Sequence, residues 1–197
     1  MSTRNLSLIV VLVVILLFGG CACGRYNGLV HADQDVQNKW GDVQTQYQRR
    51  TDLYGSVVKT IEGSANFEKS TLKDVIEARA NATKIQVNVN DSASLGAYQR
   101  AQSQLQGSFS RLMAVAESYP DLKTTQQFQD FQTNIAGTEN RINNSRRDFN
   151  ASVNGYNLEV KTFPNNIFAG MFGFHAKPYY NADAGSQNAP DIHFDIK

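Results

Sequence analysis

Residues 128–163 read FQDFQTNIAGTENRINNSRRDFNASVNGYNLEVKTF and form the longest stretch of the chain with an unbroken helical period. Apolar residues recur there in steps of three and four, and polar residues occupy the opposite side. The apolar stripe consists of Phe128, Phe131, Ile135, Ile142, Phe149, Val153, Tyr156, Val160 and Phe163, with Thr138 and Ser145 in its gaps. Because such a stripe must be buried against partner helices, the stretch predicts an amphipathic helix of a bundle.

Three more helices are predicted upstream. The first begins near Leu29 and ends near Gly63, the second covers residues 71–87, and the third ends before Pro120. Short connections at residues 63–68, 88–94 and 120–124 favour antiparallel neighbours. The predicted fold is therefore all-α: an antiparallel up-down four-helix bundle whose long first and last helices lie side by side. A short helix or turn is expected at residues 167–174.

One charged residue falls within the apolar seam of the first helix. The seam runs through Val36, Trp40, Val43, Tyr47, Tyr54, Val57 and Ile61, and Arg50 fills the position that the pattern skips. A guanidinium cannot lose its charge, so it needs a partner in such a place. If the first and last helices run antiparallel, Arg50 falls within about one turn of Glu139. We therefore predict a structural ion pair between Arg50 and Glu139.

The N-terminus carries a hydrophobic anchor. Residues 6–18 read LSLIVVLVVILLF, follow Arg4, and lead into the small residues around Cys21. Residues 17–21, LFGGC, match a loose bacterial lipobox in which Cys21 would bear the lipid. An uncleaved transmembrane helix over residues 6–23, at the short end of what spans a bilayer, and a cleaved secreted form are the two alternatives. Residues 24–28 are expected to form a short linker.

Composition limits the domains and partners of this chain. Its 197 residues and 41% hydrophobic content fit one domain, so we divide it into an anchor at 1–23, a bundle at 24–180 and a polar tail at 181–197. Lys and Arg number 19 against 18 Asp and Glu, which leaves no field that would attract nucleic acid. The only cysteines are Cys21 and Cys23, so disulfides do not hold the bundle together.

No catalytic motif stands out in the sequence. It contains no nucleophile elbow, no zinc-protease motif and no phosphate-binding glycine loop, so we expect neither an enzyme nor a cofactor. Asp191, His193 and Asp195 alternate in the tail, but a mobile tail cannot preorganise metal ligands, and His31 with the nearby Asp33 is no better. We expect no metal site. The charged residues between Glu139 and Asp148 are interpreted as an ion-pair network that fixes helix register, the alternative being a ligand or lipid-headgroup site.

Several short segments form a recognisable set: YNGLV at 26–30, QRRTDL at 48–53, EAR at 77–79, ENRI at 139–142, RRDFN at 146–150, FGF at 172–174 and PYY at 178–180. Together they resemble the LemA family of bacterial membrane-anchored helical proteins. They follow the family's order from residue 26 to the tail. One departure is that this chain has Gly55 and Ser56 where the family usually has a Pro-Asn pair. The resemblance implies a membrane-attached four-helix protein and supplies no catalytic residue.

These observations predict a non-enzymatic, membrane-anchored scaffold or interaction protein of the bacterial cell envelope. The bundle is expected on the exported side, periplasmic or extracellular, bound to a protein partner or to itself. The alternative is a module that binds lipid or a small apolar ligand through the aromatic end of the bundle. That candidate docking surface comprises Tyr156, Phe163, Phe172, Phe174, Tyr179 and Tyr180.

Overall fold

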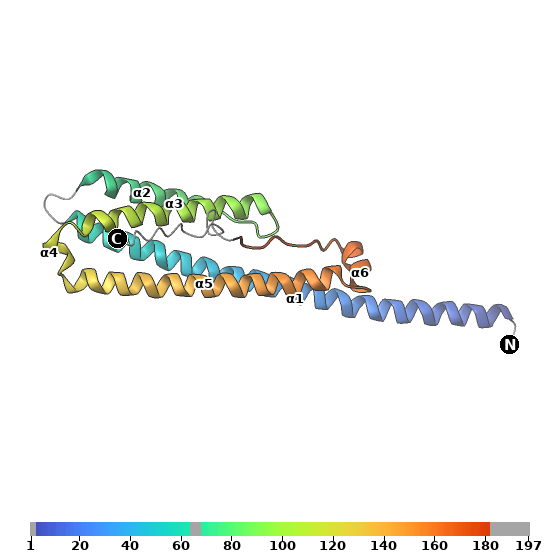
Figure 1. Ribbon diagram of the computed structural model, residues 1–197. Coiled ribbons are helices and arrows are strands. Elements are labelled where there is room, and N and C mark those ends of the chain that lie inside the picture. The colour runs from blue at the N-terminus through green and yellow to red at the C-terminus, as the bar shows by residue number, and fades with distance from the viewer. Residues whose placement is uncertain (1–2, 64–67, 182–197) are drawn as a thin grey trace, which may run out of the picture. The chain divides into compact units, whose positions relative to one another are not determined.

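The computed structural model describes residues 3–63 and 68–181 of the chain. All regular secondary structure in these residues is helical, and they contain no strand (Figure 1). The helices are α1 (Thr3–Glu62), α2 (Lys69–Lys84), α3 (Ser92–Ala116), α4 (Pro120–Lys123), α5 (Gln126–Lys161) and α6 (Asn165–Phe172). The predicted all-α class is confirmed.

Helix α1 passes through the predicted linker without a break. The linker prediction for residues 24–28 is therefore wrong. Each glycine there costs a helix about 1 kcal/mol relative to alanine. Packing on both sides of Gly28 offsets this cost, because Leu29 is only 1% exposed and the Tyr26 ring lies 5.1 Å from the Phe172 ring. Tertiary contacts decide the conformation here, and the glycines do not interrupt the helix.

The chain divides into two compact units. Unit 1 comprises Met1–Tyr47 with Asn140–Tyr179, and unit 2 comprises Gln48–Glu139 with Tyr180–Lys197. Helices α1 and α5 therefore each contribute one segment to unit 1 and another to unit 2. Within unit 1, the Trp40 ring of α1 packs edge to face on the Phe149 ring of α5, with 5.4 Å between centroids. The boundaries predicted at residues 23 and 180 remain predictions.

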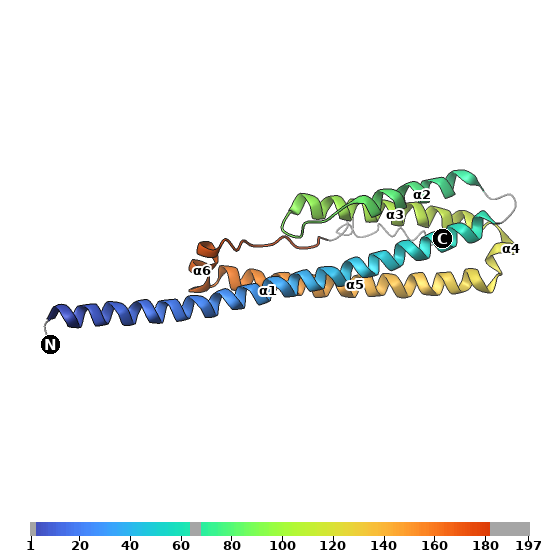
Figure 2. The ribbon, with the colours of Figure 1, turned by 180° about the vertical axis from the view of Figure 1, so that it is seen from behind.

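The core of unit 2 draws on five helices. Helices α2 and α3 lie side by side in both ribbon views (Figures 1 and 2). The Asp91 carboxylate caps α3 by accepting from the backbone N–H groups of Ala93 and Ser94, as expected for a turn between the two helices. The core contains Tyr54, Val57, Val58, Ile61, Leu72, Val75, Ala78, Ala82, Leu105, Phe109, Leu112, Ala116, Leu122 and Phe128.

Most residues of the predicted stripes are buried, while Phe131, Ile135 and Val160 are half-buried. All seven apolar seam residues of α1 are at most 6% exposed. Along α5, Phe128, Ile142, Phe149 and Val153 are at most 1% exposed, whereas Phe163 is 81% exposed. Phe163 was predicted to continue the stripe, and that prediction is wrong because α5 already ends at Lys161. Pro164 follows, and a residue before proline is pushed out of the helical conformation.

The ends of the chain carry the predicted membrane anchor, with Cys21, and the predicted polar tail. Within residues 3–63 and 68–181, no helix combines sufficient length with sufficient apolar character to cross a membrane. Cys21 belongs to α1, but its side chain lies outside the described part of the structure. The polar tail from residue 182 on, with His193, also lies outside the described residues.

Candidate functional site

Arg50 is the centre of a buried polar cluster in unit 2. Its side chain is 3% exposed, and Nη1 lies 3.4 Å from Glu139 Oε1 on α5. Its Nη2 donates to two acceptors of Gln102 on α3, the backbone carbonyl at 3.1 Å and Oε1 at 2.6 Å. The two predicted partners are thus in contact, and Gln102 is a third member that helical periodicity did not reveal. One guanidinium connects α1, α3 and α5.

Tyr54 completes this cluster one turn further along α1. Its hydroxyl donates to Glu139 Oε1 at 3.3 Å, and its ring stacks on Phe109 with centroids 3.6 Å apart. Burial raises the pKa of Tyr54 above its usual value; Arg50 opposes that rise and Glu139 adds to it. The phenol therefore stays neutral and acts as a donor to Glu139. These hydrogen bonds and the ring stacking each join α1 to α3 or α5, as expected of a cluster that fixes helix register.

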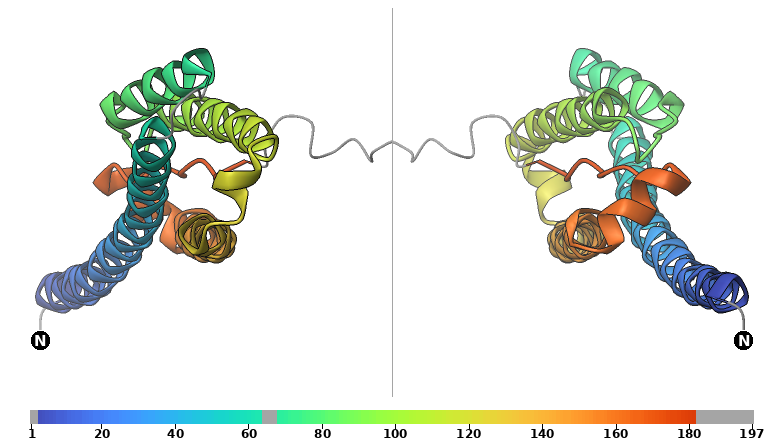
Figure 3. Two further views of the ribbon diagram at one scale, coloured as in Figure 1. Left: turned by 90° about the vertical axis from the view of Figure 1, so that its left-hand side faces the viewer. Right: turned by 90° about the vertical axis from the view of Figure 1, so that its right-hand side faces the viewer.

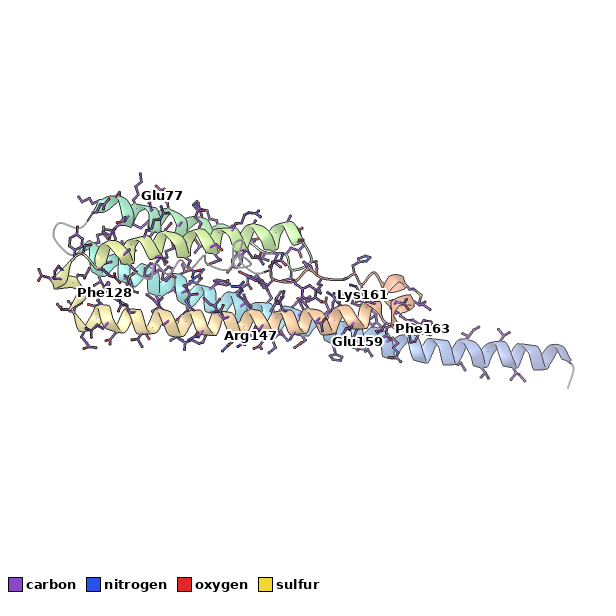
Figure 4. The ribbon with its side chains drawn as sticks, in the orientation of Figure 1. Glu77, Phe128, Arg147, Glu159, Lys161 and Phe163 are labelled. Carbon is purple, nitrogen blue, oxygen red and sulfur yellow. The ribbon has the colours of Figure 1, made fainter. Side chains whose placement is uncertain are left out.

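The other charged residues of the predicted α5 network are placed differently. Arg141, Arg147 and Asp148 are exposed, and Arg146 is half-buried. The Arg147 guanidinium donates to Asn144 of the same helix and lies on the outside of α5 (Figure 4). Within the described residues, no group of three or more His, Cys, Asp or Glu side chains could hold a metal ion. In this segment, Glu139 makes interhelical contacts with Arg50 and Tyr54.

A shallow groove borders α1 and α2 in unit 2. Its volume is about 390 Å³, and Gly55, Ile76 and Arg79 contribute to its lining. The Arg79 guanidinium lies over Gly55, and a Cβ at that position would lie 3.1 Å from the guanidinium carbon. Nη2 of Arg79 on α2 also lies 3.7 Å from Oδ1 of Asp52 on α1. The absence of a side chain at Gly55 thus gives room for this arginine.

Unit 1 contains a second buried cation, Lys177, in the segment that follows α6. Its side chain is 3% exposed, and Nζ lies 2.7 Å from Asp33 Oδ1 on α1. The same Nζ lies 4.9 Å from the centroid of the Tyr156 ring on α5, within the range of a cation–π contact. The lysine therefore connects the C-terminal segment to both long helices within unit 1.

Asn157 binds the backbone of the same lysine. Its Nδ2 donates to the Lys177 carbonyl at 2.9 Å, and its Oδ1 accepts from the Lys177 N–H at 2.8 Å, with both contacts buried. One side chain therefore satisfies both backbone groups of an extended residue. Two residues later, the Tyr179 hydroxyl donates to Asn154 Oδ1 at 3.2 Å on the surface. We call residues 174–179 the strap, because these bonds hold an extended segment along α5.

The strap cluster gives one pH-dependent prediction. Burial, and secondarily the Asp33 carboxylate, raises the pKa of Tyr156 from 10.0 to about 12. An unfolded tyrosine ionises near pH 10, so between pH 10 and 12 the unfolded state loses this proton first. The stability that the neutral phenol contributes is thus complete below pH 10 and is lost as pH rises to 12.

For this reason we expect the Tyr156→Phe variant to lose less stability than the wild type as the pH rises above 10. The wild-type free energy of unfolding should fall by about 2 kcal/mol more than that of the variant between pH 10 and 12. Urea unfolding at a series of pH values measures the difference. Tyr179→Phe, at an exposed tyrosine of the strap, is the control and should retain the wild-type pH dependence. Parallel curves for wild type and Tyr156→Phe would contradict the prediction.

The structure does not gather the six aromatic residues of the predicted docking surface. Tyr156 and Tyr180 are 2% and 4% exposed, and Tyr180 belongs to unit 2. Phe163, Phe172 and Tyr179 are exposed in unit 1. Phe174 is half-buried, with its ring 5.9 Å from that of Tyr26. Of these six residues, Phe163, Phe172 and Tyr179 are thus exposed, whereas Tyr156 contacts Lys177 of the strap.

Lys177, Asp33 and Asn157 were not predicted as a site. No helical period reaches Lys177, because it lies in an extended segment beyond the last helix. In the sequence, Asp33 is notable only for its proximity to His31; in the structure it pairs with Lys177. The sequence does show a lysine within a stretch that contains aromatic residues and a proline. Nothing in that stretch predicts which residue the lysine binds.

Sequence comparison identifies curated relatives of this chain. Magnetosome protein MamQ 2 of Paramagnetospirillum magneticum is 27% identical over 175 residues, which cover 79% of this chain and 64% of the relative. Magnetosome protein MamQ of Magnetospirillum gryphiswaldense is 26% identical over 176 residues, covering 80% and 65%. Protein LemA of Metamycoplasma hominis is 27% identical over 146 residues, covering 74% and 64%. The chain thus spans less than two thirds of the length of these relatives.

The family profile gives the clearest assignment. It matches residues 39–194, which include the Arg50 cluster and the strap. A match over this much of the chain shows the family, and it confirms the resemblance indicated by the sequence. This protein belongs to the LemA family.

Proposed function

We propose that this protein is a non-catalytic, membrane-attached helical scaffold of the bacterial cell envelope. The observation that supports the proposal best is the continuity of α1. This helix runs without a break from the proposed attachment point at Cys21 through the core of unit 1 to Glu62. A rigid connection between an anchor and a folded body suits a protein that holds a binding surface at a fixed place relative to a membrane.

The polar clusters support a structural role. The buried charges of Arg50 and Lys177 are both engaged by side chains of neighbouring helices. Such contacts specify register and hold segments together. We propose that α1, α2, α3 and α5 form an up-down bundle, as their short connections favour. Its function would be to bind a protein partner or a second copy of the chain on the exported side of the membrane.

We propose that the attachment is a lipid on Cys21. The small residues before this cysteine and the apolar run that precedes them fit a lipoprotein signal. Cleavage before Cys21 would remove residues 1–20 and leave α1 with a lipid-bearing N-terminus. The test is mass spectrometry of the mature protein from a bacterial host, which reads the N-terminal residue and its acyl mass together.

We expect Cys21→Ala to leave residues 1–20 in place and to remove the lipid mass. Cys23→Ala is the matched control, because Cys23 is an exposed thiol two positions later and should not affect processing. If Cys21→Ala keeps the wild-type mass shift and detergent partitioning, the lipid attachment is refuted. A separate experiment tests the scaffold role. Cross-linking of solubilised membranes, followed by identification of linked peptides, would identify a protein partner or a second copy of the chain.

A further inference from the structure

The segment around α6 is apolar, uncharged and partly unburied. Residues 162–174 read TFPNNIFAGMFGF and contain no Asp, Glu, Lys, Arg or His. Helix α6 buries Phe168 and Ala169, at 4% and 1% exposure, and it ends at Gly173 in the left-handed conformation. One side of α6 is therefore packed against the protein, and this packing fixes the position of the opposite side.

The outer side of α6 is formed by large apolar residues. Ile167 and Met171, one helical turn apart, are 54% and 56% exposed. Phe163, at 81%, precedes them at the turn between α5 and α6, where Figure 4 labels it. We call these three residues the α6 apolar face. Single exposed apolar residues are ordinary, but a set of three on one uncharged segment marks an interaction surface.

The α6 apolar face lies beside the N-terminal part of α1. The views in Figure 3 show α6 next to α1, and the Tyr26 ring contacts Phe172 at 5.1 Å. Tyr26 follows Cys21 by five residues, which is about 7.5 Å along a helix. Before that point α1 projects past α6 (Figure 1). The segment that cleavage before Cys21 would remove contains the exposed apolar residues Ile9, Val11, Leu12, Val13, Ile15 and Leu16, at 45% to 65% exposure.

We propose that the α6 apolar face inserts into the interface of the membrane to which the N-terminus attaches the chain. This inference rests on the proposed membrane attachment. A chain held at Cys21 keeps α6 within about 10 Å of the lipid surface, so insertion becomes an intramolecular event at high effective concentration. Tyr26 lies at the boundary, where tyrosines are enriched in membrane proteins.

The chemistry of the face favours a lipid interface over anionic headgroups. Burying Phe163, Ile167 and Met171 removes apolar area from water, whereas no charged side chain of residues 162–174 could bind a phosphate. Insertion should therefore depend little on salt or on lipid charge. A second contact beside the anchor would also restrict tilting of unit 1, which a single flexible attachment would allow.

Quenching by brominated lipid tests the proposal in the full chain. Ile167→Trp and Met171→Trp are each reconstituted in phosphatidylcholine vesicles, with and without bromine on the acyl chains. We expect brominated lipid to remove most of the emission that the new tryptophan contributes, equally at high salt and with added phosphatidylglycerol. Trp40 is only 5% exposed, and its emission in the wild-type chain provides the background.

Arg147→Trp is the control for position. Arg147 is exposed on α5, about 20 Å along the helix from its end at Lys161, and a tryptophan there should not be quenched. Flotation of the same vesicles reports attachment separately. If the chain floats but neither new tryptophan is quenched, the insertion is refuted and the attachment stands. A blue-shifted emission without quenching would mean that protein covers the face, which also overturns the proposal. Failure of the wild type to float would refute both.

Discussion

Arg50→Ala should lower the free energy of unfolding of the full chain by about 3 to 5 kcal/mol, as expected for loss of one partner from a buried polar cluster. The arginine side chain is 3% exposed, so its removal leaves Gln102 Oε1 without this donor in a buried place. It also leaves a cavity where the aliphatic stem had packed. Urea unfolding followed by far-ultraviolet circular dichroism measures the loss.

Arg50→Lys should recover only a small part of this loss. The two terminal nitrogens of the guanidinium contact different helices, since Nη1 reaches Glu139 and Nη2 reaches Gln102. A lysine has one terminal nitrogen on a flexible stem and cannot reproduce this fork. Near-complete recovery by lysine would show that charge alone matters and would contradict the geometric account.

Glu139→Ala should cost less than Arg50→Ala. The Glu139 side chain is 27% exposed and 3.4 Å from the guanidinium, so water offsets part of its loss, and Arg50 retains its bonds to Gln102. The double variant should lose less than the sum of the two single losses, because either change already breaks the pair. Glu77→Ala is the control: it removes an exposed pair with Lys73 at 3.6 Å, and should cost less than about 0.5 kcal/mol. Additive losses for Arg50 and Glu139 would show that their contact carries no energy.

Helical periodicity identified the parts of the fold that repeat. The stripe of α1 predicted its buried residues, and the skipped seam position drew attention to Arg50. Antiparallel geometry then led to Glu139, because equal steps along two helices place distant residues at one level. These predictions depend only on a regular rise and a buried face, and both are local properties of the sequence.

Helical periodicity alone did not predict where helices end or what the non-helical segments contact. Phe163 continues the spacing of α5 but lies beyond its last helical residue, so it became surface instead of core. The glycines at 24 and 28 indicated a linker, yet contacts with α6 keep α1 helical. The strap pairs Lys177 with a residue near the start of the chain. No local rule connects an extended segment to a particular helix face, so that site needed the three-dimensional structure.

Lys177→Ala should lower the free energy of unfolding by about 3 kcal/mol, the lower end of what a broken buried pair costs. Asp33 retains 21% exposure, so water solvates part of the carboxylate that the lysine leaves behind. The cation–π contact with Tyr156 is lost as well. Tyr179→Phe removes only a surface hydrogen bond of the strap and should cost less than about 0.5 kcal/mol, which makes it the matched control.

Replacing both members of the pair separates charge from attachment of the strap. Lys177→Met keeps the length of the side chain, and together with Asp33→Leu it puts apolar groups in place of the ions, so the double variant should regain most of the stability lost by Lys177→Met alone. Asn157→Ala leaves the ion pair and removes two buried bonds to the Lys177 backbone. Amide hydrogen exchange at residue 177 should then accelerate even though the charges remain. If exchange there stays at the wild-type rate in both Lys177→Ala and Asn157→Ala, neither contact holds the strap, and the stability of the segment comes from the packing of its aromatic residues.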